Sequence, residues 1–193
     1  MPDWRCHQAR GGSRRAPGWV AAEPPTVNAF CSSCGSRTET RPVAKQQLSV
    51  CPQCDRIFFR NPKVVVSALI EDGGRVLLVL RDIEPGRGLW GMPGGYVDWD
   101  EHPQDALIRE CMEEVQVRVE PLDLLEVQHI LMEDEGIVLL PYRARVIAGH
   151  PAAADEVQQV GWFRPDKLPP LAFASHRKVL QQWTQEVLAR GAA

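Results

Sequence analysis

Two apolar runs rich in β-branched residues, 64–70 and 75–80, follow Asn61-Pro62 and are separated by Asp72-Gly73-Gly74. Runs of this length on either side of an Asp-Gly turn are typical of a β-hairpin. Further strand-like runs occupy residues 122–131, 137–146 and 160–163. Glycine and proline cluster between Pro85 and Gly95, which predicts an ordered loop that leads into the next element.

Two segments carry a helical pattern. Residues 103–115 place Leu107, Ile108, Cys111 and Val115 on one stripe. From Ser175 to the end, apolar residues again recur at helical spacing: Val179, Leu180, Trp183, Val187 and Leu188. This order of strands, helix, strands and closing helix predicts an α/β fold of the mixed α+β kind, with helices packed on a mixed sheet.

The 193 residues, 44% hydrophobic, suffice for one well-buried core and a small appendage. A net charge of −3 argues against nucleic acid as the main partner. No stretch approaches the roughly 18 apolar residues of a membrane span. Residues 1–28 contain several arginines and no apolar run, so we expect a disordered tail. A transit peptide and a misassigned start remain alternatives.

Four of the six cysteines form two Cys-x-x-Cys pairs with 16 residues between them: Cys31, Cys34, Cys51 and Cys54. This spacing predicts a Cys₄ zinc ribbon over residues 29–60, against the alternatives of a redox pair or free thiols. So short a segment needs the metal for much of its folding energy. The pattern also favours a reducing compartment, so we expect a cytoplasmic protein. Cys6 lies in the expected tail, and Cys111 is interpreted as a small buried hydrophobe.

Three carboxylates stand close together on the helix predicted over residues 103–115. Glu110, Glu113 and Glu114 lie at i, i+3 and i+4 along one edge, where like charges repel. Oxygen ligands of this kind suit hard divalent cations such as Mg²⁺ or Mn²⁺. A solvated acidic face is the alternative for this helix taken alone.

The surrounding sequence places this helix in a longer pattern. Gly95, Glu101, the run Arg109-Glu110 and the run Glu113-Glu114 follow the Nudix box at fixed offsets, after the loop Leu89-Trp90-Gly91-Met92-Pro93-Gly94-Gly95. The chain therefore resembles the Nudix hydrolase family over residues 61–193, in its zinc-ribbon-containing branch. The resemblance implies a Nudix α/β/α sandwich preceded by the ribbon, and an enzyme that hydrolyses a pyrophosphate bond.

The resemblance also implies residue roles. Glu110, Glu113 and Glu114 would ligate Mg²⁺ or Mn²⁺, together with the backbone carbonyl of Gly94. Glu101 and Arg109 would form an ion pair that orients these ligands, and for both a purely structural role stays open. Two positions depart from the family pattern. Gln116 replaces the glycine that usually follows the acidic pair, and His102 stands where a Ser or Thr N-cap is more usual, with Pro103 well suited to the next position.

A further carboxylate is expected near the attacking water, because such hydrolysis needs a base or an extra ligand there. Asp155-Glu156 precedes Trp162-Phe163, and many Nudix enzymes have a glutamate in a comparable loop. The competing site is Glu133-Asp134-Glu135, whose position between two strands is more typical of a solvated hairpin tip. We prefer Glu156.

For the substrate, the resemblance implies a nucleoside diphosphate linked to another moiety, cleaved to release a nucleoside monophosphate. The aromatic and proline motif of the NADH pyrophosphatase group is not visible. Residues 60–63 and 81–90 look closer to enzymes of ADP-ribose or FAD, so we rank these substrates ahead of NADH. Five aromatic residues could stack on a base, although burial in the core is their commoner role: Phe58, Phe59, Tyr142, Trp162 and Phe163.

Two other functions stay open at this point. The zinc ribbon could contact RNA while the Nudix site removes a nucleotide cap, although Arg41 and Lys45 make only a small basic footprint. Alternatively, the domain could be a non-catalytic sensor of nucleotide sugars, which would have no need of a complete acidic box. A homodimer is compatible with the sequence.

Overall fold

The computed structural model describes residues 28–132 and 135–191. The tail expected over residues 1–28 therefore lies outside the described residues, except for Asn28. Cys6 lies in this tail and is outside them as well. The chain divides into two compact units, Met1–Arg60 and Asn61–Ala193, and each is described by itself. No helix within the described parts has the length and apolar character needed to cross a membrane.

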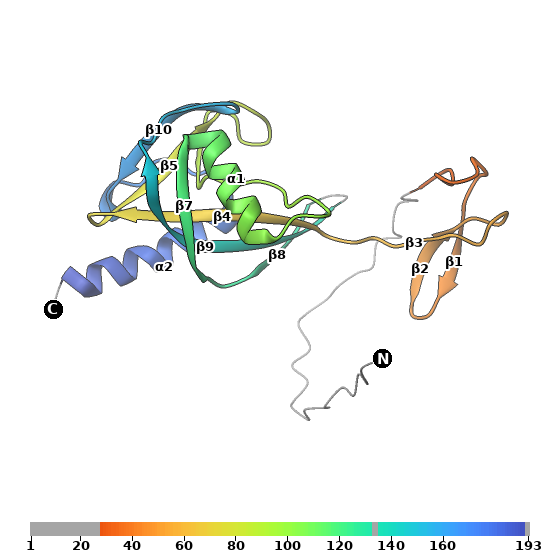
Figure 1. Ribbon diagram of the computed structural model, residues 1–193. Coiled ribbons are helices and arrows are strands. Elements are labelled where there is room, and N and C mark those ends of the chain that lie inside the picture. Colours follow the sequence, from red (N-terminus) through yellow and green to blue (C-terminus); the bar gives the residue numbers. More distant parts are fainter. Residues whose placement is uncertain (1–27, 133–134, 192–193) are drawn as a thin grey trace, which may run out of the picture. The chain divides into compact units, whose positions relative to one another are not determined.

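The first unit holds a small antiparallel sheet in the order β1-β2-β3, from β1 (Glu39–Val43), β2 (Gln46–Val50) and β3 (Ile57–Phe58) (Figure 1). Leu48 and Val50 are its buried apolar residues besides two cysteines. These short strands have too few apolar positions to show a period, so the sequence predicted this unit from its cysteines alone.

The second unit is built on a seven-stranded sheet. Its strands are β4 (Lys63–Asp72), β5 (Arg75–Arg81), β6 (Trp90–Gly91), β7 (Val117–Leu124), β8 (Gln128–Leu131), β9 (Gly136–Gly149) and β10 (Val157–Phe163). The order is β10-β5-β4-β9-β7, with β6 paired to β5 and β8 to β9. Strands β4 and β9 are parallel and the other pairs antiparallel, so the sheet is mixed, as predicted.

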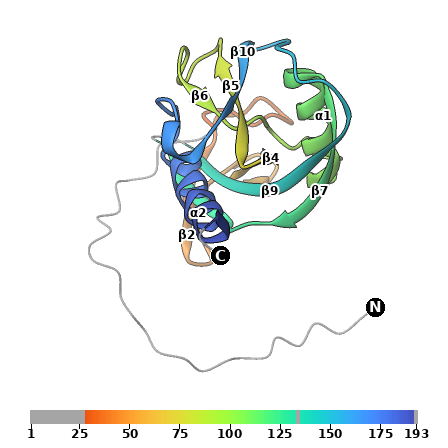
Figure 2. The same ribbon diagram turned by 90° about the vertical axis from the view of Figure 1, so that its left-hand side faces the viewer.

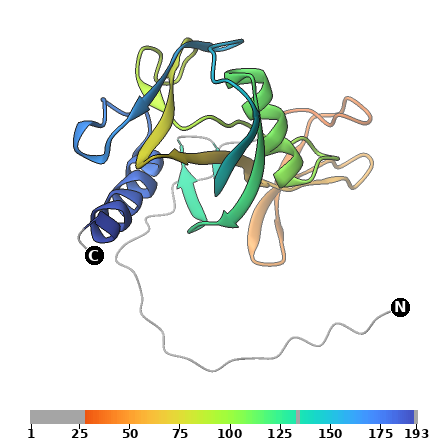
Figure 3. The same cartoon turned by 60° about the vertical axis from the view of Figure 1, so that its left-hand side comes forward.

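Two helices cover opposite faces of this sheet, α1 (Pro103–Val115) and α2 (Ala174–Gly191), and a short 3₁₀ turn, η1 (Pro165–Lys167), precedes α2 (Figure 2). The alternation along β4 explains the layers. Val66 and Ile70 enter the core beneath α1, whereas Leu69 packs with Trp183 of α2. Figure 3 shows the same sandwich from a third side. The predicted α/β/α class is therefore confirmed.

Hydrogen bonds to Glu71 of β4 fix where α2 sits on the sheet. Its carboxylate accepts from Trp183 Nε1 at 2.9 Å and from Arg190 Nη2 at 3.1 Å. Arg143 of β9 contacts the same carboxylate at 3.5 Å and binds Glu186 of α2 at 2.6 Å. Strand β4 is thus joined to the helix near the strand's C-terminal end.

Strands β4 and β5 separate soon after their hairpin, and a loop fills the gap. The two strands pair only through the register Glu71↔Val76 and Asp72↔Arg75. Farther along β4, Ala68 N donates to Pro93 O at 2.8 Å and Val66 N to Gly95 O at 2.9 Å. Residues 93–95 therefore lie directly against β4. Gly94 has φ +145°, and a Cβ there would lie 2.1 Å from Val66 O, so the position requires glycine.

The strand expected over residues 122–131 is two strands. Strand β7 begins five residues earlier, at Val117, and β8 starts only at Gln128 after an irregular turn. The alternation of buried Val117 and Val119 with exposed Arg118 was the signal for the earlier start. By contrast, the helix predicted over residues 103–115 has those limits in the structure.

Candidate active site

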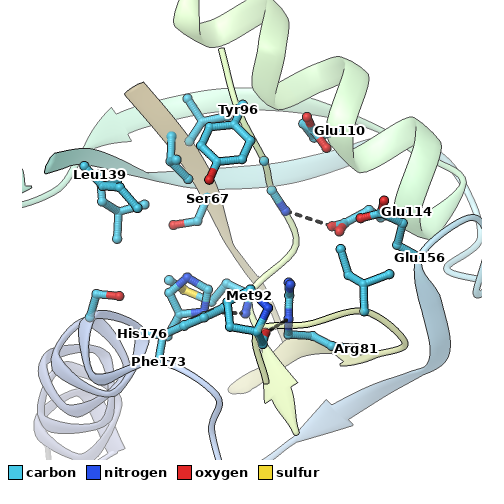
Figure 4. Close-up of a pocket in the computed structure, with 18 of the residues that line it drawn as sticks. Ser67, Arg81, Met92, Tyr96, Glu110, Glu114, Leu139, Glu156, Phe173 and His176 are labelled. Carbon is cyan, nitrogen blue, oxygen red and sulfur yellow. Dashed lines mark hydrogen bonds between the residues drawn. The ribbon is translucent and has the colours of Figure 1, made fainter. Parts of the chain in front are cut away.

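A cavity of about 720 Å³ opens between the acidic edge of α1, the loop at residues 92–96 and the first turn of α2 (Figure 4). Its two ends differ in chemistry. Carboxylates line one end, and mainly apolar side chains from β4, β8 and β9 line the other. In Figure 4, Glu110, Glu114 and Glu156 lie on one side of the space and Leu139 with Tyr96 on the other.

Glu114 is the most buried of the helix carboxylates, with 8% of its surface exposed. Its Oε2 accepts a hydrogen bond from Gly94 N at 2.8 Å, which ties the helix to the glycine loop. Burial, together with the neighbouring charges of Glu110 and Glu156, raises the pKa of Glu114 to about 7. The positive charge around Glu114 is therefore too small to offset the cost of burying its ionised carboxylate.

Glu110 lies against the backbone of Gly95. A Cβ added at Gly95 would come within 2.4–2.6 Å of the Glu110 carboxylate, so only glycine leaves room for this carboxylate. Burial raises the pKa of Glu110 as well, although Arg109 Nη1 donates to its Oε1 at 2.8 Å. One buried and one partly buried carboxylate thus face the same end of the cavity.

Arg109 connects the acidic residues to one another. Its guanidinium donates to both oxygens of Glu101, from Nε at 2.9 Å and from Nη2 at 2.8 Å. Its Nη1 also donates to half-exposed Glu113 at 3.0 Å, and its Nη2 to Tyr96 O at 3.0 Å. The hydrogen bonds from Arg109 hold the pKa of Glu101 below its usual range. The ion pair expected between Glu101 and Arg109 is present, and it joins the loop to the helix.

The donor set of the acidic end fits a hard divalent cation. Glu114 is buried and Glu110 is partly buried, and burial raises the pKa of both although Arg109 bonds Glu110, so their ionised forms carry an electrostatic cost. A divalent cation would remove that electrostatic cost through oxygen ligands. In this arrangement Arg109 Nη1 bonds both Glu110 and Glu113, whereas Glu114 bonds Gly94 N. Within the described residues, the four cysteines form the only metal-type cluster.

Glu156, the residue preferred as the further carboxylate, stands in the loop before β10. It lines the acidic end, and its charge contributes to the raised pKa of Glu114. Its backbone carbonyl accepts from Asp82 N at 2.8 Å, which fixes the loop before β10 against the end of β5. Of the competing site, residues 133–134 lie outside the described part of the chain. Glu135 forms an ion pair with Lys63 at 2.7 Å.

Several cavity residues escaped the sequence analysis: Ser67, Arg81, Tyr96, Phe173 and His176. None belongs to the acidic box, and only their places on β4, β5, the glycine loop and the start of α2 bring them together. Conversely, no aromatic residue proposed for stacking lines the cavity. Tyr142 is in the core under α1, and Phe163 packs edge-to-face on Trp90 with ring centroids 4.7 Å apart.

Three remaining positions singled out in the sequence lie on helix α1 or at its ends. His102 is the N-cap of α1, and its Nδ1 accepts from Gln104 N at 3.3 Å, so histidine replaces the usual Ser or Thr in this role. Gln116 ends the helix in the left-handed region at φ 56°. Cys111 is fully buried in the core beneath α1, as predicted.

The first unit contains the cysteine cluster. The Sγ atoms of all four cysteines lie within 4.8 Å of one another, with Cys31–Cys54 at 3.6 Å and Cys34–Cys51 at 3.5 Å. A tetrahedral zinc site with Zn–S bonds of about 2.3 Å has sulfurs about 3.8 Å apart, so the spacing fits Zn²⁺. A hydrogen bond from Ser33 N lowers the pKa of the Cys31 thiol, whereas the neighbouring cysteines raise the pKa of Cys54 to about 12.

Comparison with known proteins agrees with this geometry. Residues 60–183 match the model of the NUDIX domain, and the chain belongs to this family of Nudix hydrolases. It is similar to a NUDIX hydrolase from Nitrosomonas europaea of known structure, with a TM-score of 0.75 and 30% identity, covering 82% of this chain and 92% of that one.

Two curated relatives carry functional names. An ADP-ribose pyrophosphatase from Methanocaldococcus jannaschii is 29% identical over 128 residues, which cover 65% of this chain and 75% of the relative. The NAD-capped RNA hydrolase NudC from Pseudomonas aeruginosa is 28% identical over 164 residues, 84% of this chain. The chain spans 56% of the length of that relative. The 164 residues exceed the 133 of the second unit (193 − 60), so this similarity reaches into the cysteine unit.

Proposed function

We propose that this chain hydrolyses, with Mg²⁺ or Mn²⁺, the pyrophosphate bond of a nucleoside diphosphate linked to a second moiety. ADP-ribose and FAD rank first as substrates, followed by NADH, and the expected product is a nucleoside monophosphate. The observation that carries the proposal is the continuous cavity with several carboxylates at one end, among them buried Glu114, and an apolar wall at the other. Such a space suits a ligand that has a charged diphosphate in its middle and a planar aromatic ring at one end.

The acidic end would hold the metal through Glu110, Glu113 and Glu114, with the Gly94 carbonyl as a further ligand. Bound there, the metal supplies positive charge against the diphosphate and Lewis acidity for the attacking water. Glu101 would keep Arg109 in place, and Arg109 in turn positions Glu110 and Glu113 through the hydrogen bonds described above.

The remaining roles follow from position in the cavity. Glu156, exposed and close to Glu114, is the candidate to take a proton from the attacking water. Arg81 lines the cavity, with its Nε bonded to Pro85 O at 3.0 Å and its guanidinium over Phe173. A guanidinium held in this way is suited to a phosphate group of the substrate.

A screen of ADP-ribose, FAD, NADH and nucleotide sugars with Mg²⁺ and with Mn²⁺ tests this proposal, with the products separated by chromatography. The expected result is metal-dependent release of a nucleoside monophosphate from an adenosine-containing substrate. Binding of these compounds without any turnover would instead support the sensor alternative and reject the enzyme.

A second candidate is hydrolysis of a nucleotide cap on RNA, favoured by the similarity to NudC across the cysteine unit. Residues 28–60 carry five Lys or Arg against two acidic residues, and Phe30 and Phe59 are more than 60% exposed. Exposed aromatic rings with basic neighbours are typical of surfaces that stack single-stranded bases. Salt-sensitive affinity for RNA that Phe30→Ala with Phe59→Ala abolishes, while activity on small substrates persists, would distinguish this function.

A further inference from the structure

One face of β4 carries a buried polar residue, Ser67, between the part of the strand that lines the cavity and the part that α2 covers. Alternate residues of the strand, from Val65 through Ser67 and Leu69 to Glu71, point toward the α2 side. The helix covers the second half of this row, since Leu69 packs with Trp183 and Glu71 accepts from its indole N–H. The first half, Val65 and Ser67, lines the cavity (Figure 4).

The hydroxyl of Ser67 has no hydrogen-bond partner among the residues that the structure describes. The residue is 1% exposed, and its register partner on β9 is Pro141, which has no N–H to donate. A buried hydroxyl without a partner destabilises a fold, because it has lost its hydrogen bonds to water. An apolar residue at this position would serve the fold alone better than serine does.

His176, in the first turn of α2, presents a second polar group to the same space. Met92 N donates to its Nδ1 at 3.0 Å, so Nδ1 carries no proton. Burial and the charge of Arg81 lower the pKa of His176 to about 3, which keeps the ring neutral. A neutral imidazole with an unprotonated Nδ1 has its proton on Nε2. His176 lines the cavity and is therefore a fixed hydrogen-bond donor there.

The surroundings of these two residues are apolar and include aromatic rings. Leu139 is 2% exposed and Ile137 lies beside it on β9, while Ile130 comes from β8. Tyr96 and Phe173 stand at the edges of the same space (Figure 4). An apolar pocket with a few fixed polar groups is the usual form of a site for a planar heterocycle.

We propose that this end of the cavity binds the nucleobase of the substrate, with Ser67 and His176 as the residues that select it. The inference rests on the proposed function for the diphosphate, and it adds where the base lies and which side chains read it. The hydroxyl can donate or accept, whereas His176 only donates, so the base must offer an acceptor to His176. Adenine offers ring nitrogens as acceptors beside an amino group that can donate to Ser67 Oγ.

The test uses adenosine as the probe, because adenosine lacks phosphate and binds without metal. Affinities are measured by NMR titration for the wild type, Ser67→Ala and His176→Asn. Asparagine can still accept from Met92 N through its side-chain oxygen but cannot reproduce the Nε2 donor. Each variant should lower adenosine affinity about five- to tenfold, the effect of one lost hydrogen bond. Ser67→Ala should also raise KM for the diphosphate substrate and leave kcat unchanged.

Thr184→Val is the matched control, since Thr184 has the other buried hydroxyl without a partner among the described residues and does not line the cavity. Ser67→Ala and Thr184→Val should both melt at or above the wild-type temperature, but only Ser67→Ala should lose affinity. Absence of saturable adenosine binding to the wild type, or equal affinity in Ser67→Ala, would overturn the assignment. Ser67-dependent adenosine binding by a protein without hydrolase activity would keep the base site and reject the proposed function instead.

Discussion

The chain contains two clusters of acidic or thiol side chains with metal-ligating chemistry, and the clusters are built in opposite ways. The four cysteine sulfurs already lie within 4.8 Å of one another, on two short turns of the first unit. The glutamates of α1, two of them bridged by Arg109, open onto a cavity of about 720 Å³. Only the second arrangement leaves space beside the metal position for another molecule.

The difference indicates what each cluster is for. A closed Cys₄ site has no open position for a substrate, so its metal would stabilise the fold. In the glutamate site, Glu114 is buried and Glu110 partly buried, and both pKa values are raised, so a cation bound there would stabilise the ionised carboxylates. The contrast is therefore between a metal that would stabilise a fold and a metal that would take part in chemistry.

The largest effect is expected on the cysteine unit. Cys51→Ser, or removal of zinc by a chelator, should abolish ordered structure in residues 28–60, because structural zinc contributes on the order of 10 kcal/mol in such small units. Residues 61–191 should keep their own cooperative transition, since they form a separate compact unit with its own core. Hydrogen exchange followed by mass spectrometry measures both regions in one sample.

The buried cysteine of the second unit provides the control for this experiment. Cys111→Ala removes a thiol from the core beneath α1 and should leave the zinc content at one per chain. If the Cys51→Ser protein kept full protection from hydrogen exchange over residues 28–60, the first unit would fold without metal. The claim that its metal stabilises the fold would then be wrong.

The next effect concerns turnover. Glu114→Gln and Glu110→Gln should each lower kcat by about 10³-fold or more, because several kcal/mol of charge stabilisation depend on the metal. The fold should persist, since glutamine can still accept from Gly94 N at position 114. Rates with ADP-ribose and Mg²⁺, together with thermal melts, measure the two properties separately. Glu120→Gln, which removes a surface partner of Arg145, is the control and should match the wild type. Unchanged activity in both cavity variants would refute the ligand assignment.

A smaller effect is expected when Glu101, which holds Arg109 beside the proposed metal ligands, is altered. Glu101→Gln takes a charge from Arg109, so Arg109 should bind Glu110 and Glu113 more strongly and compete with the metal. Metal affinity should fall about 10- to 100-fold, the usual effect of losing an outer partner. Excess Mg²⁺ should restore most of the activity. Asp105→Asn in the first turn of the same helix is the control. A loss of kcat that saturating Mg²⁺ does not restore would place Glu101 in the chemistry itself.

The sequence predicted the second unit in detail where pattern and spacing act locally. The limits of α1, the mixed sheet and the family followed from apolar periodicity and from fixed offsets in the acidic box. Cysteine spacing led to the four sulfurs that the structure brings together, but not to the strands around them. The apolar end of the cavity could not be predicted. Ser67, Tyr96 and His176 come from distant segments, and only the parting of β4 and β5 brings them together.

Position also explains why the aromatic residues took the commoner role, burial in the core, instead of stacking on a base. Tyr142 alternates on β9 with Leu139 and Arg143, and the alternation places it in the core under α1 rather than in the cavity. Which face of a strand receives which helix depends on the topology of the whole sheet. Composition and local pattern do not carry that information.

The smallest expected effect tests whether left-handed positions are tolerated alike in the two units. Gln116 ends α1 at φ 56°, and Asp55 occupies the matching place after the second cysteine pair at φ 54°, where the first pair has Gly35. A residue other than glycine in the left-handed conformation costs about 1–2 kcal/mol of folding free energy. Substitution by glycine removes this strain, but it also makes the unfolded chain more flexible, which offsets about 0.4–1 kcal/mol of the gain. Gln116→Gly should therefore stabilise the second unit by about 0.5–1 kcal/mol, and Asp55→Gly should gain less, because aspartate tolerates this conformation better.

Chemical denaturation of the second unit measures the effect, and Gln104→Gly is its control at the other end of α1. At that position glycine relieves no strain and only adds flexibility to the unfolded chain, so the free energy of unfolding of this variant should fall by about 0.5–1 kcal/mol. Gln116 is no ligand, and the Gln116→Gly enzyme should keep wild-type kcat. If Gln116→Gly were destabilised like Gln104→Gly, the glutamine would be supplying a compensating contact at the helix end, and the departure from glycine would have a structural purpose of its own.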